Sequence, residues 1–372
     1  MPNHKTSAWP LAQAYTTLIV YASLYPFTGW RDQGIAPWAF LASPWPKYWT
    51  GFDVAANLLG YAPLGFLLAL SFLRKGGRRV MPSNRAAIAV ASLVAALLSL
   101  CMEALQSYLP SRVPSNVDFA LNAAGALGGA VVAGGLELAG AIDRWSRFRL
   151  RWFVEEARGA LVLLALWPLA LLFPASVPLG LGQVFERLET ALADWLLDTP
   201  FLEWLPLREI ELQPLMPGTE LLCVAVGALI PCLLGFSVIR SIGRRAVFSF
   251  VAIGVGVLAT ALSAALSWGP GHAWSWLSHP VRLGLGAGLA LAMASLPLPR
   301  RGCAALLLVA LVIHLAMLNQ APASAYFAQT LQTWEQGRFI RFNGLVQWLG
   351  WLWPYAALVY VLVRVSARER EA

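Results

Sequence analysis

The segment EALQSYLPSRVPSNVDFALNAAGALGGA, residues 103–130, connects two long apolar stretches of the chain. Its centre is polar and contains Pro110 and Pro114, which disfavour a continuous helix. The flanking apolar stretches, at 86–108 and 117–141, each have at least the roughly 20 residues that a helix needs to cross a bilayer. The segment therefore predicts a hairpin of two transmembrane helices joined by a polar turn.

Apolar stretches of similar length recur along the whole chain. Of its 372 residues, 58% are hydrophobic and 12% are charged, a composition that excludes an ordinary soluble protein. We predict an all-α polytopic membrane helical bundle with about ten transmembrane helices. The ten stretches lie at 11–27, 52–73, 86–108, 117–141, 159–175, 218–239, 246–268, 280–298, 302–319 and 344–364.

The distribution of lysine and arginine predicts the orientation of this bundle. Every second loop is basic, and this set of loops carries 19 of the 27 Lys and Arg residues. Because short basic loops stay in the cytoplasm, both termini are predicted to be cytoplasmic. Trp9, Trp145 and Trp152 then mark the inner membrane border. The net charge of +8 is mostly an orientation signal, and no nucleic-acid partner is predicted.

Two outer-face segments share one pattern of polar residues. Residues 47–60 read KYWTGFDVAANLLG, and residues 112–125 read RVPSNVDFALNAAG. The shared spacing predicts that the first four helices form two hairpins related as parallel repeats. Coincidence in a chain rich in Gly, Ala and Leu is the alternative. The paired positions are Lys47 with Arg112, Asp53 with Asp118, Asn57 with Asn122 and Gly60 with Gly125.

The spacing also places these residues on shared helix faces. Each aspartate lies four residues before its asparagine, so the two side chains fall on one face of a helix. On the later helix that face continues through Gly125 and Gly129, small residues that let another backbone approach closely. We expect the polar faces to look toward neighbouring helices. The aspartates could instead cap their helix N-termini and serve stability alone.

Glu103 and Gln106 lie near the C-terminal, outer end of their helix. A negative charge is unfavourable there because the last carbonyls of a helix are unpaired. A cation is therefore expected nearby, and Arg112 and Arg31 are predicted on the same side. A carboxylate at the membrane border is a candidate functional group. A purely structural bridge between Glu103 and Arg112 is the alternative.

This succession of residues resembles the VanZ-like family of membrane proteins. The motif region covers residues 18–130, in which LIVYASLYPFTGW at 18–30 suits the family's first helix. The resemblance implies a cell-envelope protein of the bacterial inner membrane and a link to low-level resistance to teicoplanin-type glycopeptide antibiotics. It implies no reaction, because none is established for the family. The matching positions are Asn57, Pro63, Gly65, Glu103, Gln106, Arg112, Asp118, Asn122, Gly125 and Gly129.

The part of the chain beyond the motif region is expected to form a second domain. We predict a VanZ-like four-helix membrane domain at 1–142 and a second membrane domain of about six helices at 143–372. Apolar residues at helical spacing within 183–197 predict an amphipathic helix on the outer border. Its polar face is acidic, which favours packing over the bundle mouth. Polar and aromatic residues between 329 and 353 could bind a glycan or anchor the protein at the interface.

Cysteine and histidine give no support for a metal site or a cofactor. The cysteines form no CxxC pair and are typical of small buried hydrophobic residues. His272 and His279 have no carboxylate between them, and His314 is expected to be a hydrogen-bonded residue of the bundle. The P-loop, HExxH and GxSxG motifs are absent. The cysteines are Cys101, Cys223, Cys232 and Cys303.

We predict a polar pocket, open to the outer leaflet, that binds or presents a lipid-linked, glycan or peptidoglycan-related ligand, with membrane lipid as the other partner. Arg112 and Lys47 would contact an anionic group of that ligand. The alternative is a transferase or hydrolase with Glu103 and Asp118 as acid and base. Transport is disfavoured because the inner halves of the helices offer no continuous polar path. The candidate site residues are Arg31, Lys47, Asp53, Asn57, Glu103, Gln106, Arg112, Asp118 and Asn122.

Overall fold

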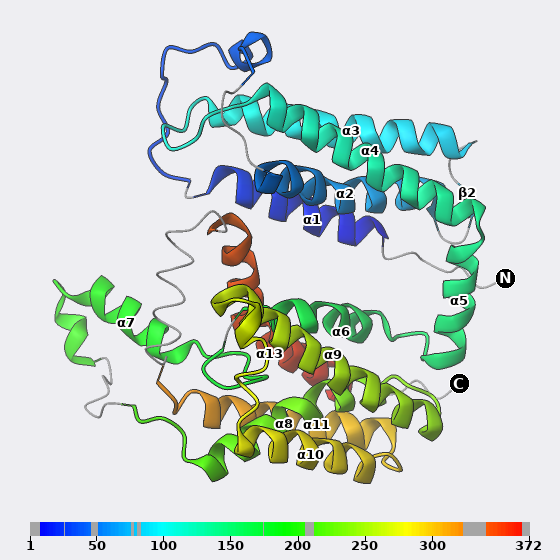
Figure 1. Ribbon diagram of the computed structural model, residues 1–372, viewed down its shortest axis with the longest axis vertical. Helices are drawn as coiled ribbons and strands as arrows, with labels where there is room; N and C mark the ends of the chain where they lie inside the picture. Colours follow the sequence, from blue (N-terminus) through cyan, green and yellow to red (C-terminus); the bar gives the residue numbers. More distant parts are fainter. Residues whose placement is uncertain are drawn as a thin grey trace. The chain divides into compact units, whose positions relative to one another are not determined.

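The computed structural model describes residues 8–25, 27–45, 51–75, 78–79, 83–173, 175–204, 212–322 and 340–366. Within these residues the fold is all-α apart from one pair of two-residue strands, which confirms the predicted fold class (Figure 1). The chain divides into two compact units, Met1–Phe148 and Arg149–Ala372. We call them unit 1 and unit 2 and describe each by itself.

The described part of unit 1 contains the helices α1 to α4 and the first part of α5, which continues past the unit boundary at Phe148. Helices α2, α3 and α4 contact one another in all three pairings, and α1 packs against α2 and α3 (Figure 1). Serine side chains begin two of these helices, since Ser83 accepts a hydrogen bond from the Ala86 N–H and Ser115 accepts one from the Asp118 N–H. The helices are α1 (Ala8–Leu24), α2 (Gly51–Leu73), α3 (Asn84–Gln106), α4 (Asn116–Leu138) and α5 (Ala141–Trp152), with the short helix η1 (Ala39–Ala42) and the antiparallel strands β1 (Arg74–Lys75) and β2 (Arg78–Arg79).

Glycines set the close approach of α2 and α4. A Cβ added at Gly125 would collide with the backbone of Leu58, and one added at Gly129 would collide with the backbone of Ala62. The small-residue face predicted on the later helix is therefore confirmed as a close helix contact. This contact brings the polar side chains at the outer ends of α2 and α4 together.

Unit 2 is built around α8. Most of this helix is buried, including Cys223, Cys232 and Phe236, and it contacts α6, α9, α10 and α11. Between α6 and α7 the chain is largely irregular yet buried, for example at Leu179 and Leu181. The elements are α6 (Arg158–Ala170), α7 (Phe185–Leu196), η2 (Pro200–Trp204), α8 (Pro217–Phe236), α9 (Ile242–Trp268), η3 (Pro270–His272), α10 (His279–Ala294), α11 (Arg300–Leu318) and α13 (Ile340–Ser366).

All ten predicted stretches contain a helix, but three of these helices are short. Within the described residues, seven helices are long and apolar enough to cross a membrane. The exceptions are α1, α6 and α10, with 17, 13 and 16 residues. A helix of 13 residues is about 20 Å long, less than the roughly 30 Å of a hydrocarbon core. The chain is a multi-pass helical membrane protein, and the count of ten crossings stays a prediction.

The structure tests three smaller predictions. The amphipathic helix predicted near 183–197 is confirmed as α7, while its place over the bundle mouth stays a prediction. His314 is confirmed as a buried bundle residue, with its Nδ1 3.8 Å from the Sγ of Cys223. The expectation that every cysteine is buried is wrong for Cys101, which lies on the exposed face of α3 with Leu97 and Leu105. Of the predicted cluster at 329–353, residues 329–339 lie outside the described part of the chain.

Candidate functional site

Three helices of unit 1 each contribute two polar side chains to one region. The two residues of every pair are four positions apart and therefore share a helix face. Because glycine lets α2 and α4 approach closely, and α3 packs against both, the three faces meet. We call this set the polar cluster. It consists of Asn57 and Tyr61 on α2, Ser99 and Glu103 on α3, and Asp118 and Asn122 on α4.

The outer part of the polar cluster is a chain of hydrogen bonds that ends at two carboxylates. Asn57 Nδ2 donates to Asp118 Oδ1 over 3.0 Å, and the backbone N–H of Ser115 donates to Glu103 Oε2 over 2.8 Å. Ser115 Oγ also accepts from the backbone N–H of Asp118 over 3.2 Å. Ser115 therefore contacts both acidic residues, so Glu103 and Asp118 belong to one neighbourhood at the start of α4.

The inner part of the polar cluster contains two unpaired polar atoms. Asn122 Nδ2 donates to Ser99 Oγ over 3.0 Å, and both residues are buried. Tyr61 lies close enough to Ser99 and Glu103 to interact with both. Among the described residues, however, neither the Tyr61 hydroxyl nor Asn122 Oδ1 has a hydrogen-bond partner. Such atoms are rare in native proteins and call for an explanation.

Gln106 and Arg112 contact the C-terminal end of α1. Gln106 Nε2 donates to the Ser23 carbonyl over 2.9 Å, and an Arg112 guanidinium nitrogen donates to the Tyr25 carbonyl over 2.8 Å. The last carbonyls of a helix have no partners within the helix, and a cation there also complements the helix dipole. These two residues thereby support the end of α1. The predicted role of Arg112 as an anion contact stays a prediction.

The remaining predicted site residues lie at the outer border of unit 1. Arg31 is exposed, and its backbone N–H donates to the Tyr108 carbonyl over 3.0 Å, which places the chain after α1 beside the end of α3. Asp53 is exposed in the first turn of α2. Lys47 lies outside the described residues.

The matched positions of the two predicted repeats make different contacts. Asn57 pairs with an aspartate of α4, whereas Asn122 pairs with a serine of α3. A Cβ at Gly60 would meet nothing within 4 Å among the described residues, whereas Gly125 is packed against α2. The twofold relation between the hairpins stays a prediction.

Tyr61 and Ser99 of the polar cluster, and Ser115 beside it, were not predicted from the sequence. Ser115 precedes Asp118 by three positions, a spacing typical of a helix N-cap, and this signal was available. Tyr61 and Ser99 lie four positions from Asn57 and Glu103 and continue each polar face by one turn, but tyrosine and serine are too common in membrane helices for this spacing alone to identify them.

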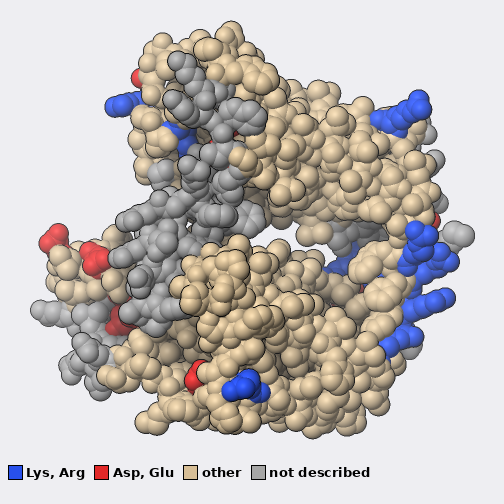
Figure 2. Space-filling view, in the orientation of Figure 1, with Lys and Arg blue, Asp and Glu red and all other residues tan. Residues whose placement is uncertain are grey.

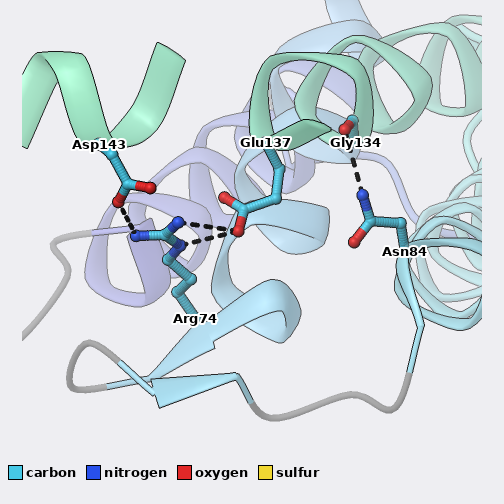
Figure 3. Close-up of polar contacts among 5 residues, drawn as sticks. All are labelled: Arg74, Asn84, Gly134, Glu137 and Asp143. Atoms are coloured by element: carbon cyan, nitrogen blue, oxygen red, sulfur yellow. Dashed lines mark hydrogen bonds and ion pairs between the residues drawn. The ribbon is translucent and has the colours of Figure 1, made fainter. Parts of the chain in front are cut away.

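A second polar group in unit 1 joins the end of α2 to α4 and α5 (Figure 3). The Arg74 guanidinium lies 2.9 Å from Glu137 Oε1 and 2.5 Å from Asp143 Oδ1. The hydrogen bond with Asp143 is the main reason that the pKa of Arg74 lies above its usual value, and it also lowers the pKa of Asp143. Asn84 Nδ2 donates to the Gly134 carbonyl over 3.3 Å beside this group (Figure 3). Two ion pairs of Arg74 thus link these helices at the end of the bundle opposite the polar cluster.

Unit 2 offers a cavity of about 10 Å³, lined in part by Gly182, Gln183 and Trp351. This volume suits one water molecule and no larger ligand. Across the described residues, no three His, Cys, Asp or Glu side chains gather into a group that could hold a metal ion. The polar cluster is therefore the strongest candidate site.

A family model described as VanZ/LLP1 matches residues 4–137. This range includes the whole polar cluster, Gln106 and Arg112, and it confirms the resemblance seen in the sequence. No curated protein and no solved structure matches the chain. Residues 4–137, which contain α1 to α3 and α4 up to Glu137, are therefore similar to the VanZ-like family.

Proposed function

We propose that the VanZ-like region binds or presents a lipid-linked or peptidoglycan-related envelope ligand in the polar cluster. One observation supports this most directly: the Tyr61 hydroxyl and Asn122 Oδ1 are buried without a partner among the described residues. A buried unpaired polar group costs about 1–3 kcal/mol. Two such groups beside a buried Glu103 favour a bound polar group that pairs with both.

The ligand group in the inner part of the cluster is expected to be uncharged. Glu103 and Asp118 both belong to the polar cluster, and two carboxylates disfavour a phosphate close to them. A tyrosine hydroxyl can donate or accept, whereas the asparagine Oδ1 only accepts. A sugar hydroxyl, or an amide group that donates its N–H to Asn122 and accepts from Tyr61 through its carbonyl, satisfies both. Any phosphate of the same ligand would remain at the outer border near Arg112.

The difference in burial across the cluster supports an entry route from its outer end. Asn57, Ser115 and Asp118 are only half-buried, whereas Ser99 and Asn122 are buried. The ligand is therefore expected to approach from the outer end and to separate the contact between Asn57 and Asp118. This direction suits a lipid-linked precursor, whose headgroup lies at the membrane surface while its lipid remains in the bilayer.

Single substitutions that remove one polar atom test the proposal. Tyr61→Phe and Asn122→Leu are expected to lower the amount of lipid-linked peptidoglycan precursor that co-purifies with the protein by about five- to tenfold. Ser92→Ala is a matched control, because Ser92 Oγ is also buried and unpaired among the described residues but lies seven positions before Ser99 on α3. Mass spectrometry of the bound lipid fraction measures the effect.

The role in antibiotic susceptibility is tested in cells. Expression of the wild type in a glycopeptide-susceptible bacterium is expected to raise the inhibitory concentration of teicoplanin, and Tyr61→Phe is expected to abolish the rise. Unchanged precursor binding and unchanged susceptibility in both cluster variants, at normal membrane insertion, would show that the unpaired atoms have no ligand role.

An enzyme acting on a lipid-linked substrate is the second candidate. It is favoured by Ser115, whose N–H binds the Glu103 carboxylate and whose Oγ binds the backbone N–H of Asp118, because these contacts keep the two acidic residues in one neighbourhood. One would act as acid and the other as base. Purified protein that releases product from a lipid-linked precursor, and loses this activity in Glu103→Gln without losing precursor binding, would support this candidate over binding alone.

A further inference from the structure

Helix α5 continues past the unit boundary at Phe148, and Trp152 at its end packs against the core of unit 2. Neither the polar cluster nor these cores explain the arrangement of its other side chains. The sequence of α5 is AIDRWSRFRLRW, and none of its twelve residues, all of which the structure describes, is buried. At helical spacing, the aromatic residues share one side of the helix and three arginines share the adjacent side. The aromatic residues are Trp145, Phe148 and Trp152, and the arginines are Arg144, Arg147 and Arg151.

The aromatic side of α5 is exposed, although contact of large apolar rings with water is unfavourable. Trp145 is 56% exposed and Phe148 is 39% exposed. Their rings stack on each other with centroids 5.5 Å apart. Large apolar side chains that are exposed together mark an interaction surface. Tryptophan next to arginine is typical of the border between hydrocarbon and headgroups, because the rings enter the bilayer while the guanidinium groups remain at the phosphates.

The start of α5 is held at the end of a membrane helix. The chain leaves α4 at Leu138 and turns at Gly140, whose φ of 66° is readily adopted by glycine. Asp143, in the first turn of α5, is then bound by Arg74 at the end of α2 (Figure 3). Since α2 and α4 are long enough to cross a membrane, these connections place the start of α5 at the membrane border.

The charge of α5 is complementary to an anionic membrane surface. The helix contains four arginines and a single acidic residue, Asp143. In Figure 2, Lys and Arg side chains, drawn in blue, follow the place that α5 occupies in Figure 1. We propose that α5 is an interfacial helix that binds anionic phospholipid headgroups through its arginines while Trp145 and Phe148 enter the leaflet.

Lipid binding by the full-length protein tests this proposal. Native mass spectrometry in detergent compares the binding of phosphatidylglycerol with that of phosphatidylcholine. The wild type is expected to prefer phosphatidylglycerol, and Arg144→Gln with Arg147→Gln and Arg151→Gln is expected to reduce the preference by about fivefold for each arginine removed. Arg300→Gln with Arg301→Gln is the control, because these exposed arginines begin α11 without an aromatic stripe beside them.

A second measurement tests the aromatic side independently. Hydrogen exchange over residues 141–152 is recorded in nanodiscs of phosphatidylcholine, with and without phosphatidylglycerol. Exchange is expected to slow in the anionic discs for the wild type and to stay fast in Trp145→Ser with Phe148→Ser. Two results would overturn the proposal: the same lipid preference in the wild type and the arginine variant, or the same exchange rate in nanodiscs with and without phosphatidylglycerol. Either result would leave α5 as a surface for a protein partner.

Discussion

The guanidinium of Arg74 contacts two carboxylates that differ in exposure. The Glu137 side chain is 8% exposed, whereas the Asp143 side chain is 56% exposed. Removing the arginine leaves a nearly buried carboxylate without this partner, which costs about 3 kcal/mol. Removing Asp143 breaks only a solvent-screened pair, which contributes about 0.5 kcal/mol. Arg74→Gln is therefore expected to lower the midpoint of thermal unfolding in detergent far more than Asp143→Asn does.

The same pair predicts a pH dependence with a definite sign. Because the hydrogen bond to Arg74 lowers the pKa of folded Asp143, this contact stabilises the protein above the ordinary aspartate pKa of about 3.9. The stabilisation is lost as the pH falls through the lowered pKa. The difference in unfolding midpoint between wild type and Asp143→Asn should be constant near neutral pH and vanish in acid. A difference that grows on acidification would contradict the assignment.

Single residues of the polar cluster were predictable to different degrees. Asn57, Asp118 and Asn122 could be named because charged or amide side chains four apart are unusual in an apolar helix. Tyr61 and Ser99 could not, because tyrosine and serine are common in membrane helices and gain importance only from the neighbours that α3 and α4 bring to them. The contact of Arg112 with Tyr25 joins residues 87 positions apart, which no local pattern indicates.

At the scale of elements, the contact between α2 and α4 depends on one side of α4 carrying no Cβ. Gly129→Ala is expected to destabilise the protein by about 3 kcal/mol, since its methyl group would overlap the Ala62 backbone. Gly128→Ala is the adjacent control: a Cβ there would meet nothing within 4 Å among the described residues. That change should alter stability by less than about 1 kcal/mol. Chemical unfolding in mixed micelles measures both, and equal effects would show that helix propensity alone is involved.

Helix lengths were less predictable than helix positions, and the stretch 159–175 shows why. Apolar composition indicates burial in a bilayer or in protein, and it does not by itself indicate a helix. The helix α6 ends at Ala170, yet Leu171, Val177 and Leu179 beyond it are buried against other helices of unit 2. Irregular backbone is tolerated at membrane depth only when protein surrounds it. Hydropathy therefore detected the segment but could not separate the helix from the irregular chain that follows.

At the scale of the whole molecule, the number of crossings determines the side on which each loop lies. Ten crossings, with Ser111 on the outer side, place Ser241 in the cytoplasm and Ser275 outside. If only the seven long helices crossed, Ser241 would be outside and Ser275 inside. The arginines at 240, 244 and 245 favour ten, because a short basic loop is retained in the cytoplasm.

Labelling of single cysteines introduced at these positions tests this topology directly. All three serines are exposed, and Cys101→Ala removes the native exposed thiol. In intact cells without an outer membrane, a membrane-impermeant maleimide is expected to label Ser111→Cys and Ser275→Cys but not Ser241→Cys, which should react only after the membrane is opened. Labelling of Ser241→Cys in intact cells together with protection of Ser275→Cys would show that α6 does not cross, because α6 is the one short apolar helix described between Ser111 and Ser241.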